Sequence, residues 1–160
     1  MECKKHPESE KLYIEQIDLG EPEGKIRTIG SGLQPYVTLD EMLDGKIVVF
    51  ANLKPKKLGG VPSEGMVLCA SNEDHTVVEL IRPPADAKIG DRIGFEDSKL
   101  IPHFSQDACA VLNPKRKVEG KVLQHLKTNG DKELIYNGQK LVTSDGKYLH
   151  SKSLANVSVS

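Results

Sequence analysis

Apolar and polar residues alternate over short stretches in the first 95 residues, a pattern that predicts strands more than helices. Residues 11–17 place Leu12 and Ile14 on one face, whereas several later runs are continuously apolar, as buried strands are. We expect strands within residues 11–17, 25–33, 47–53, 65–71, 76–83 and, after a turn, 87–95. Residues 72–75 would then form the loop of a hairpin.

Two segments carry helix signals. Thr38 and Glu41 have the spacing of a capping box, which predicts a short helix that ends at Gly45. Asn113 before Pro114 predicts the start of a second helix, which would continue to Lys127 with apolar residues at helical spacing. Beyond it we expect a hairpin of residues 133–136 and 139–142 around Asn137-Gly138, and a further strand at 147–150.

The order of these elements predicts a mainly β fold. Five or six strands with one short helix suit a small closed or partly open barrel, of which the five-stranded OB-fold is one version. The pattern alone does not choose between the OB-fold and other small barrels. Periodicity fades over residues 97–110, which indicates a linker. We therefore expect a barrel domain at 1–97 and a small C-terminal α+β unit at 110–160.

Composition narrows the class of protein. The cysteines Cys3, Cys69 and Cys109 form no C-x-x-C pair, which favours free thiols and a reducing compartment. No apolar run is long enough to cross a membrane, and the first residues lack the apolar core of a signal peptide. We therefore expect a cytoplasmic protein. Because no catalytic, metal-binding or cofactor-binding motif is recognisable, we predict a chain that is not an enzyme and holds neither metal nor cofactor.

The charges are distributed unevenly, although the net charge is only -1. Between Lys46 and Ser63 there are four lysines and no acid, and three of them, Lys54, Lys56 and Lys57, surround Pro55. Such lysines could neutralise the phosphates of a folded RNA, but taken alone a solvated loop is the simpler reading. The second predicted helix adds basic residues against a single acid, Glu119; these are Lys115, Arg116, Lys117, Lys121 and Lys127.

The run ANLKPKKLGGVPSEGMVLCAS, residues 51–71, resembles the signature of the tRNA-binding domain of the endothelial monocyte-activating polypeptide family. Three other stretches carry the same resemblance: residues 4–21, 29–33 and 83–93. It implies an OB-fold that binds tRNA with little sequence preference. By the same resemblance, the implied tRNA contacts are Ser31, Gly32, Asn52, Lys54, Lys56, Lys57, Ser63 and Met66.

Other roles remain open for three of these residues. Met66 could equally fill the core, Ser63 could cap a turn, and Asn52 could hold the loop. Because the basic loop contains no arginine, point-charge contacts to phosphates are favoured over reading of bases. The resemblance also implies a first strand of the type D-x-R-V-G-x-I-x, which is almost entirely missing before Glu2, so the barrel is expected to lack part of it.

The resemblance also implies partners. Such domains are appended to aminoacyl-tRNA synthetases or synthetase complexes, methionyl-tRNA synthetase being favoured here and the lysyl or tyrosyl enzyme an alternative. The module would raise the local tRNA concentration for the catalytic domain. Residues 110–160 would take the place of the second subunit of dimeric bacterial relatives, so we expect a monomer. The alternative function is a secreted, cytokine-like polypeptide released from a synthetase.

Overall fold

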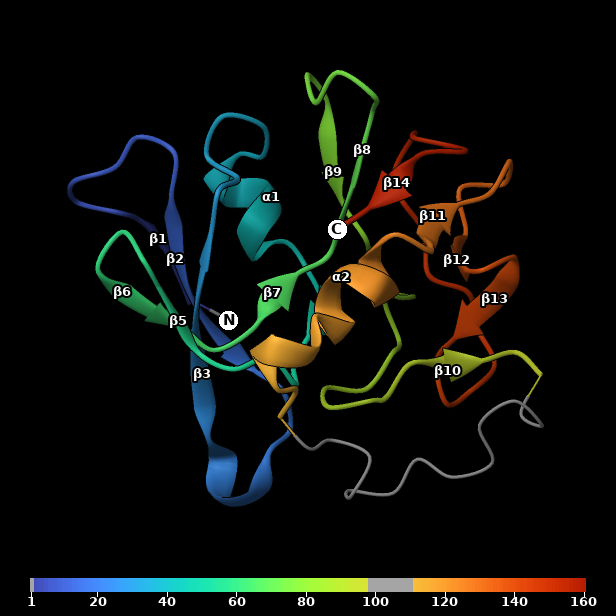
Figure 1. Cartoon of the computed structure of the whole chain (residues 1–160), viewed down its shortest axis with the longest axis horizontal. Coiled ribbons are helices and arrows are strands. Elements are labelled where there is room, and N and C mark those ends of the chain that lie inside the picture. Colours follow the sequence, from blue (N-terminus) through green and yellow to red (C-terminus); the bar gives the residue numbers. More distant parts are fainter. Residues whose placement is uncertain (1, 98–110) are drawn as a thin grey trace.

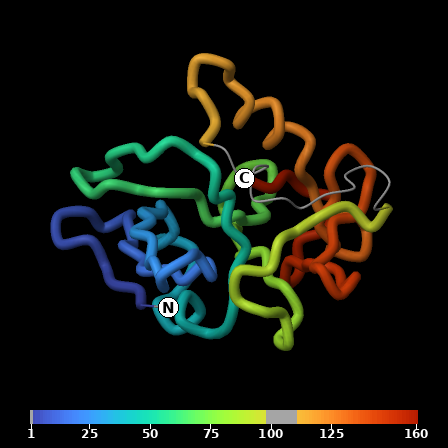
Figure 2. The backbone as a smooth tube through the Cα atoms, turned by 90° about the horizontal axis from the view of Figure 1, so that it is seen from below, coloured from blue at the N-terminus to red at the C-terminus, as the bar shows by residue number. Residues whose placement is uncertain are grey.

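The structure is a computed structural model that describes residues 2–97 and 111–160. Strands dominate, and the only two α-helices in these ranges are α1 (Leu39–Leu43) and α2 (Val118–Leu123). The predicted mainly β class is therefore confirmed. Figures 1 and 2 show the N-terminal strands on one side of the molecule and the C-terminal strands on the other. Most of the predicted linker, including Cys109, lies outside the described residues.

The first sheet is an antiparallel meander of β1 (Glu2–Lys5), β2 (Tyr13–Asp18) and β3 (Ile26–Ser31). β2 and β3 correspond to the two predicted N-terminal strands and pair along their whole length. β1 was not predicted, because the alternation of apolar residues begins only after it. Its four residues pair with β2, so the segment before His6 does supply a strand to this sheet.

Two short antiparallel pairs follow. β4 (Val49–Phe50) pairs with β7 (Met66–Val67), and β5 (Lys56–Leu58) pairs with β6 (Val61–Ser63). The strand predicted over 47–53 is thus only two residues long.

The strand predicted over 65–71 is divided at Leu68 into β7 and β8 (Cys69–Ser71). The Leu68 N–H donates to the Val48 carbonyl, whereas its own carbonyl accepts from Ile81. The chain therefore changes pairing partners at Leu68, which no pattern of apolar residues reveals.

The largest sheet has seven strands and joins both parts of the chain. Its order is β10 (Gly94–Phe95), β13 (Gln139–Val142), β12 (Leu134–Tyr136), β11 (Leu126–Thr128), β14 (Ser158–Val159), β8 and β9 (Val78–Leu80). The predicted hairpins β8–β9 and β12–β13 are both present. β14 links the two parts, because Ser158 lies opposite Lys127 on one side and Ser71 on the other. The strand predicted at 147–150 is reduced to isolated bridges at Tyr148 and His150.

The hydrophobic core has two clusters. The first lies within the N-terminal part and includes Tyr13, Ile29 and Met42, all almost completely buried. The second combines residues of both parts, such as Ile81 with Leu149. The boundary between residues 1–97 and 110–160 stays a prediction, but the two parts share one core. Removing the C-terminal part would therefore expose apolar surface of the barrel part.

The first predicted helix is confirmed in detail. The Thr38 side chain accepts a hydrogen bond from the Glu41 N–H, and the Glu41 carboxylate accepts from the Thr38 N–H. This reciprocal pair satisfies two backbone donors that the first turn of a helix otherwise leaves unpaired. A capping box is thus a reliable local signal even in a helix of five residues.

The second predicted helix is wrong in length. The segment begins with a 3₁₀ turn, η3 (Pro114–Arg116), and Lys117 then adopts a left-handed conformation with φ 52° before α2 starts. α2 ends at Leu123, and Leu126–Thr128 form β11 instead. Pairing on both sides of β11 and burial of Leu126 outweigh the helical spacing of the apolar residues. No helix in residues 2–97 or 111–160 is long and apolar enough to cross a membrane.

Candidate nucleic-acid interface

The basic stretch that was expected to be a loop is a β-hairpin. β5 and β6 are joined by Gly59-Gly60, whose φ angles are +57° and +82°. Two successive positive φ values match the type I′ turn that joins strands in two-residue hairpins, and glycine adopts them without steric cost. The double glycine between two short extended stretches was the available signal for this hairpin.

Hydrogen bonds fix both ends of the hairpin to the first sheet. At its tip, His6 Nε2 lies 2.8 Å from the Gly59 carbonyl oxygen. At its base, the Ser63 hydroxyl accepts from the Gly30 N–H at 3.0 Å and donates to the Gly65 carbonyl at 3.1 Å. The lysines of β5 are therefore carried by an ordered backbone rather than by a free loop.

A groove of about 390 Å³ lies between this hairpin, β3, β7 and α2. We call it the basic groove. Six of the eight predicted contact residues line it: Ser31, Gly32, Lys54, Lys56, Ser63 and Met66. Sequence reasoning missed Tyr36 and Leu58, which also line it and are 43% and 40% exposed. Met66 lines the groove and also packs against the second core cluster.

The lysines differ in where they point and in what they contact. Alternation along β5 places Lys56 and Leu58 toward the groove and Lys57 on the opposite face. Lys56 is 68% exposed, and its Nζ lies 3.7 Å from a carboxylate oxygen of Glu119 on α2. Within the described residues, Lys54 and Lys57 make no ion pair. Their charges are therefore open to an anionic partner.

The segment of η3 and α2 forms a second basic wall. The Asn113 side chain caps η3 by accepting from the Lys115 N–H, and the Leu112 N–H donates to the Asn52 carbonyl, which ties this segment to the end of β4. Figure 1 shows α2 next to β7, and both elements contribute residues to the groove. The exposed basic residues on this segment are Lys115, Arg116, Lys117 and Lys121. Lys127 instead lies on β11.

The floor of the groove rests on a buried carboxyl group. The Ser31 hydroxyl donates to Glu15 Oε1, and Glu15 is completely buried on β2. Among the described residues its other oxygen, Oε2, has no hydrogen-bond partner. Burial, only partly offset by the Ser31 hydrogen bond, raises the pKa of Glu15 to about 7. Burial also raises the pKa of the nearby thiols Cys3 and Cys69 to about 12, and both are free cysteines.

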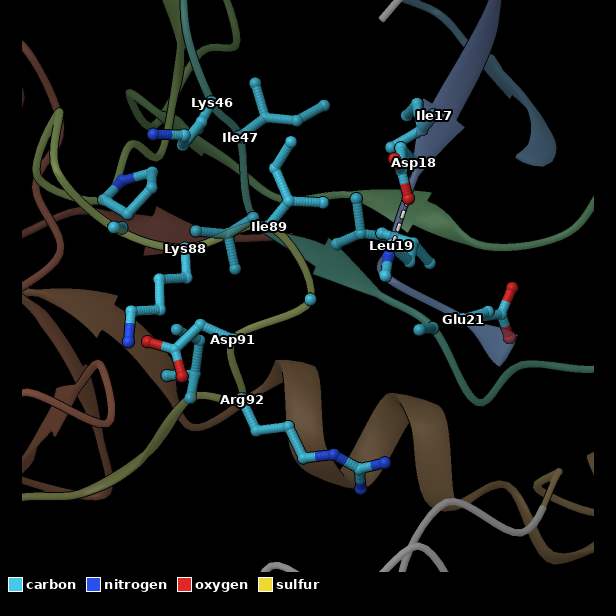
Figure 3. Close-up of a pocket in the computed structure, with 18 of the residues that line it drawn as sticks. Ile17, Asp18, Leu19, Glu21, Lys46, Ile47, Lys88, Ile89, Asp91 and Arg92 are labelled. Carbon is cyan, nitrogen blue, oxygen red and sulfur yellow. Dashed lines mark hydrogen bonds between the residues drawn. The ribbon is translucent and has the colours of Figure 1, made fainter. Parts of the chain in front are cut away.

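Asn52 does not line the basic groove but a second cavity of about 690 Å³. Figure 3 shows this cavity between the segment of Ile17 and Leu19 and the segment of Lys88 and Ile89. Apolar side chains such as Leu19 and Ile89 line this cavity. Gly20 and Gly90 pack back to back beside it, so closely that a Cβ on either would lie within 3 Å of the other's backbone. The structure therefore does not bring Asn52 together with the six residues of the groove. Its carbonyl holds Leu112 in place, consistent with a structural role.

In residues 2–97 and 111–160, no group of three or more His, Cys, Asp or Glu side chains could hold a metal ion. The groove offers ammonium groups, hydroxyls and one carboxylate, which suits binding of a polar anionic polymer.

Comparison with known proteins is consistent with this geometry. Residues 1–92 match the model of the family described as "Putative tRNA binding domain", which covers more than half of the chain. The chain belongs to this tRNA-binding domain family. The matched range contains β1 to β9 and every residue of the predicted contact set.

The segments of known proteins that match this chain are parts of larger proteins. The chain is 41% identical over 144 residues to a probable methionine–tRNA ligase of Oryza sativa, which covers 90% of this chain and 17% of that protein. It is 45% identical over 114 residues to the tRNA-aminoacylation cofactor arc1 of Schizosaccharomyces pombe, covering 71% of this chain and 24% of the cofactor. It thus spans less than a quarter of either relative.

A solved structure matches the whole fold. The C-terminal domain of Plasmodium vivax p43 superimposes with a TM-score of 0.80 at 29% identity, covering 99% of this chain and 91% of that domain. The likeness therefore includes the C-terminal strands, which lie beyond the range of the family model.

Proposed function

We propose that this chain is a non-catalytic tRNA-binding module, built on an OB-fold barrel, that holds tRNA mainly through its phosphates. The observation that carries the proposal is the anchored β5–β6 hairpin, whose lysines stand in water next to a groove lined by most of the predicted contacts. Membership of the tRNA-binding domain family supports the choice of tRNA among anionic partners. Lysines act as point charges on phosphate, so little sequence preference is expected.

The test is the salt dependence of binding. Replacing Lys54, Lys56 and Lys57 by Ala should flatten the plot of log affinity against log salt by roughly 2 to 3 units, at about 0.7 to 0.9 per lost phosphate contact. Affinity should fall by a similar factor for every tRNA, because phosphates carry no direct sequence information. Titrations of several tRNA transcripts at a series of salt concentrations measure both quantities.

A matched control removes three exposed lysines elsewhere on the surface. Lys25, Lys88 and Lys127 are exposed and do not line the basic groove. Their replacement by Ala changes the net charge equally and should leave most of the slope in place. An unchanged slope in the folded hairpin variant, or an equal loss in the control, would contradict the role of the hairpin.

We further propose that the module serves as an appendage of a synthetase or a synthetase complex in the cytoplasm, with methionyl-tRNA synthetase favoured. The relatives that carry similar segments, a methionine–tRNA ligase and an aminoacylation cofactor, support this. Tethering tRNA beside a catalytic domain raises its effective concentration. Fused to a methionyl-tRNA synthetase catalytic domain, the chain should lower KM for tRNA without raising kcat, and an unchanged KM would contradict this proposal.

We also propose that the protein is monomeric. In the seven-stranded sheet, β8 is flanked on both sides by strands of the same chain, β9 and β14. An edge that is already paired offers no free backbone groups to a second copy. Sedimentation equilibrium should give the mass of one chain, and a stable dimer would overturn the proposal.

A further inference from the structure

Two of the hydroxyl groups that line the basic groove, those of Ser31 and Ser63, have already used their hydrogens. Ser31 donates to the buried Glu15, and Ser63 donates to the Gly65 carbonyl. A serine hydroxyl has one hydrogen to donate and two lone pairs that accept. Toward the groove both serines therefore present acceptor positions only, and neither can donate to a phosphate oxygen.

Glu119 adds a third acceptor. Among the described residues that line the groove, it is the only one with an acidic side chain. Its distance of 3.7 Å from Lys56 Nζ is an ion pair but too long for a hydrogen bond. No hydrogen bond to its carboxylate is found within the described residues, so its lone pairs stay open. A carboxylate repels phosphate and is costly in a groove that serves phosphates alone.

The groove is thus divided by chemistry. Lysines supply donors and positive charge on its rim, whereas Ser31, Ser63 and Glu119 supply acceptors within it. Nucleic acids carry matching groups: phosphates accept, while ribose 2′-hydroxyls and the amino groups of bases donate. Base amino groups are accessible mainly where a nucleotide is unpaired. At about 390 Å³, the groove is in the size range of sites that hold small molecules.

We propose that the acceptors in the groove take the hydrogen-bond donors of an unpaired nucleotide, and that Glu119 is the residue that distinguishes this nucleotide from a bare polyanion. The proposal rests on the proposed function and deepens it, because it adds a donor-recognising part to a phosphate-binding site. Glu119 offsets the charge of Lys56 in the free protein. When RNA binds, Lys56 pairs with a phosphate instead, and the Glu119 carboxylate accepts a hydrogen bond from a ribose hydroxyl or a base amino group.

The experiment compares three probes on Glu119→Gln and wild type: a tRNA transcript, the same sequence as single-stranded DNA, and long-chain inorganic polyphosphate. Removing the negative charge should raise affinity for polyphosphate by about 3- to 10-fold at low salt. The tRNA should gain little or nothing, because the same change weakens a charge-assisted hydrogen bond. Glu23→Gln is the matched control, because Glu23 is an exposed acidic residue outside the groove. It should not change the affinity for one probe more than the affinity for the others.

The three probes also separate the sources of the donor. If Glu119→Gln raises the affinity for DNA as much as that for polyphosphate, but not the affinity for tRNA, the ribose 2′-hydroxyl is the donor. If the affinity for DNA, like that for tRNA, rises less than the affinity for polyphosphate, base amino groups are the donors. If tRNA gains as much as polyphosphate, Glu119 recognises no donor and the proposal is overturned. The proposed function fails separately, if wild type does not bind tRNA or if the hairpin lysines leave the salt slope unchanged.

A second variant tests an acceptor without changing charge. Ser31→Ala should weaken tRNA binding by about 3- to 10-fold, leave polyphosphate binding unchanged and leave the salt slope unchanged. Equal loss for tRNA and polyphosphate would contradict an acceptor role for Ser31. Circular dichroism and thermal unfolding show whether Ser31→Ala is folded. If Ser31→Ala does not fold, Glu119→Gln still tests the proposal, because it changes a partly exposed side chain.

Discussion

The floor and the rim of the basic groove use polar residues in opposite ways. On the floor, Ser31 and Ser63 are hydrogen-bonded within the fold, and Glu15 lies in the interior beneath them. On the rim, Lys54 and Lys56 are exposed to solvent, as is Lys57 on the outer face of β5, and of the three only Lys56 has an ion-pair partner in the described residues. Changes to the floor should therefore alter the stability of the protein, and changes to the rim should alter its binding alone.

The largest stability effect is expected at Glu15. Its pKa is about 7 in the folded protein and about 4.5 in the unfolded chain. Below pH 4.5 both states hold the proton. Between pH 4.5 and 7 the unfolded chain loses it while the folded protein keeps it, so the free energy of unfolding should fall by about 3 kcal/mol as pH rises through this window. Urea unfolding of wild type and Glu15→Gln at several pH values measures the effect.

The glutamine variant cannot titrate, so its stability should vary less across this window. Other carboxyl groups with lowered pKa act at a different pH. Glu21, whose pKa is lowered by its hydrogen bond to Arg27, and Glu41, whose pKa is lowered by Thr38, lose their contribution as pH falls below about 4.5. Equal pH dependence of the two proteins between pH 4.5 and 7 would contradict the assignment to Glu15.

An intermediate effect is expected at Ser63. Ser63→Ala leaves the Gly30 N–H and the Gly65 carbonyl without their partner and should lower the free energy of unfolding by about 1 to 2 kcal/mol. Ser63→Thr keeps the hydroxyl, and threonine suits a strand, so it should recover most of the loss. Thermal and urea unfolding test this. If threonine is as destabilising as alanine, the hydroxyl does not hold the hairpin.

The smallest stability effect is expected for the exposed lysines of the rim and of β5. Replacing Lys54, Lys56 and Lys57 by Ala should change the free energy of unfolding by less than about 0.5 kcal/mol per site, because exposed side chains contribute little. The same variant has the largest expected effect on the salt dependence of binding. A loss of stability as large as that of Ser63→Ala would remove the distinction between floor and rim.

Local signals in the sequence predicted local structure well. The capping box of Thr38 and Glu41 and the turn at Asn137-Gly138 each depend on neighbouring residues only, and both are present. The basic stretch was located correctly, but its Gly59-Gly60 turn was not recognised as a hairpin. The β5 and β6 strands are too short for a periodic pattern to stand out.

Features that depend on distant residues were not predictable in the same way. The helix expected to reach Lys127 ends early because residues 126–128 pair with β12 and β14. The Glu15–Ser31 contact joins β2 to β3, and an acidic residue in an alternating strand gives no sign that it will be buried. Asn52 was grouped with the lysines by its position in the sequence, whereas the turn of the chain after β4 places it on the second cavity.

The position of β14 has a consequence for synthesis. β8 finishes at Ser71, yet the strand that covers its open side is Ser158–Val159, near the end of the chain. While a ribosome translates the intervening 86 residues, the β8–β9 hairpin has an exposed edge, with backbone groups that a neighbouring nascent chain could pair with. Closure of the sheet must wait until Ser158 and Val159 have emerged from the ribosome. The risk of premature pairing is therefore greatest during translation, and slow translation of residues 72–157 would prolong it.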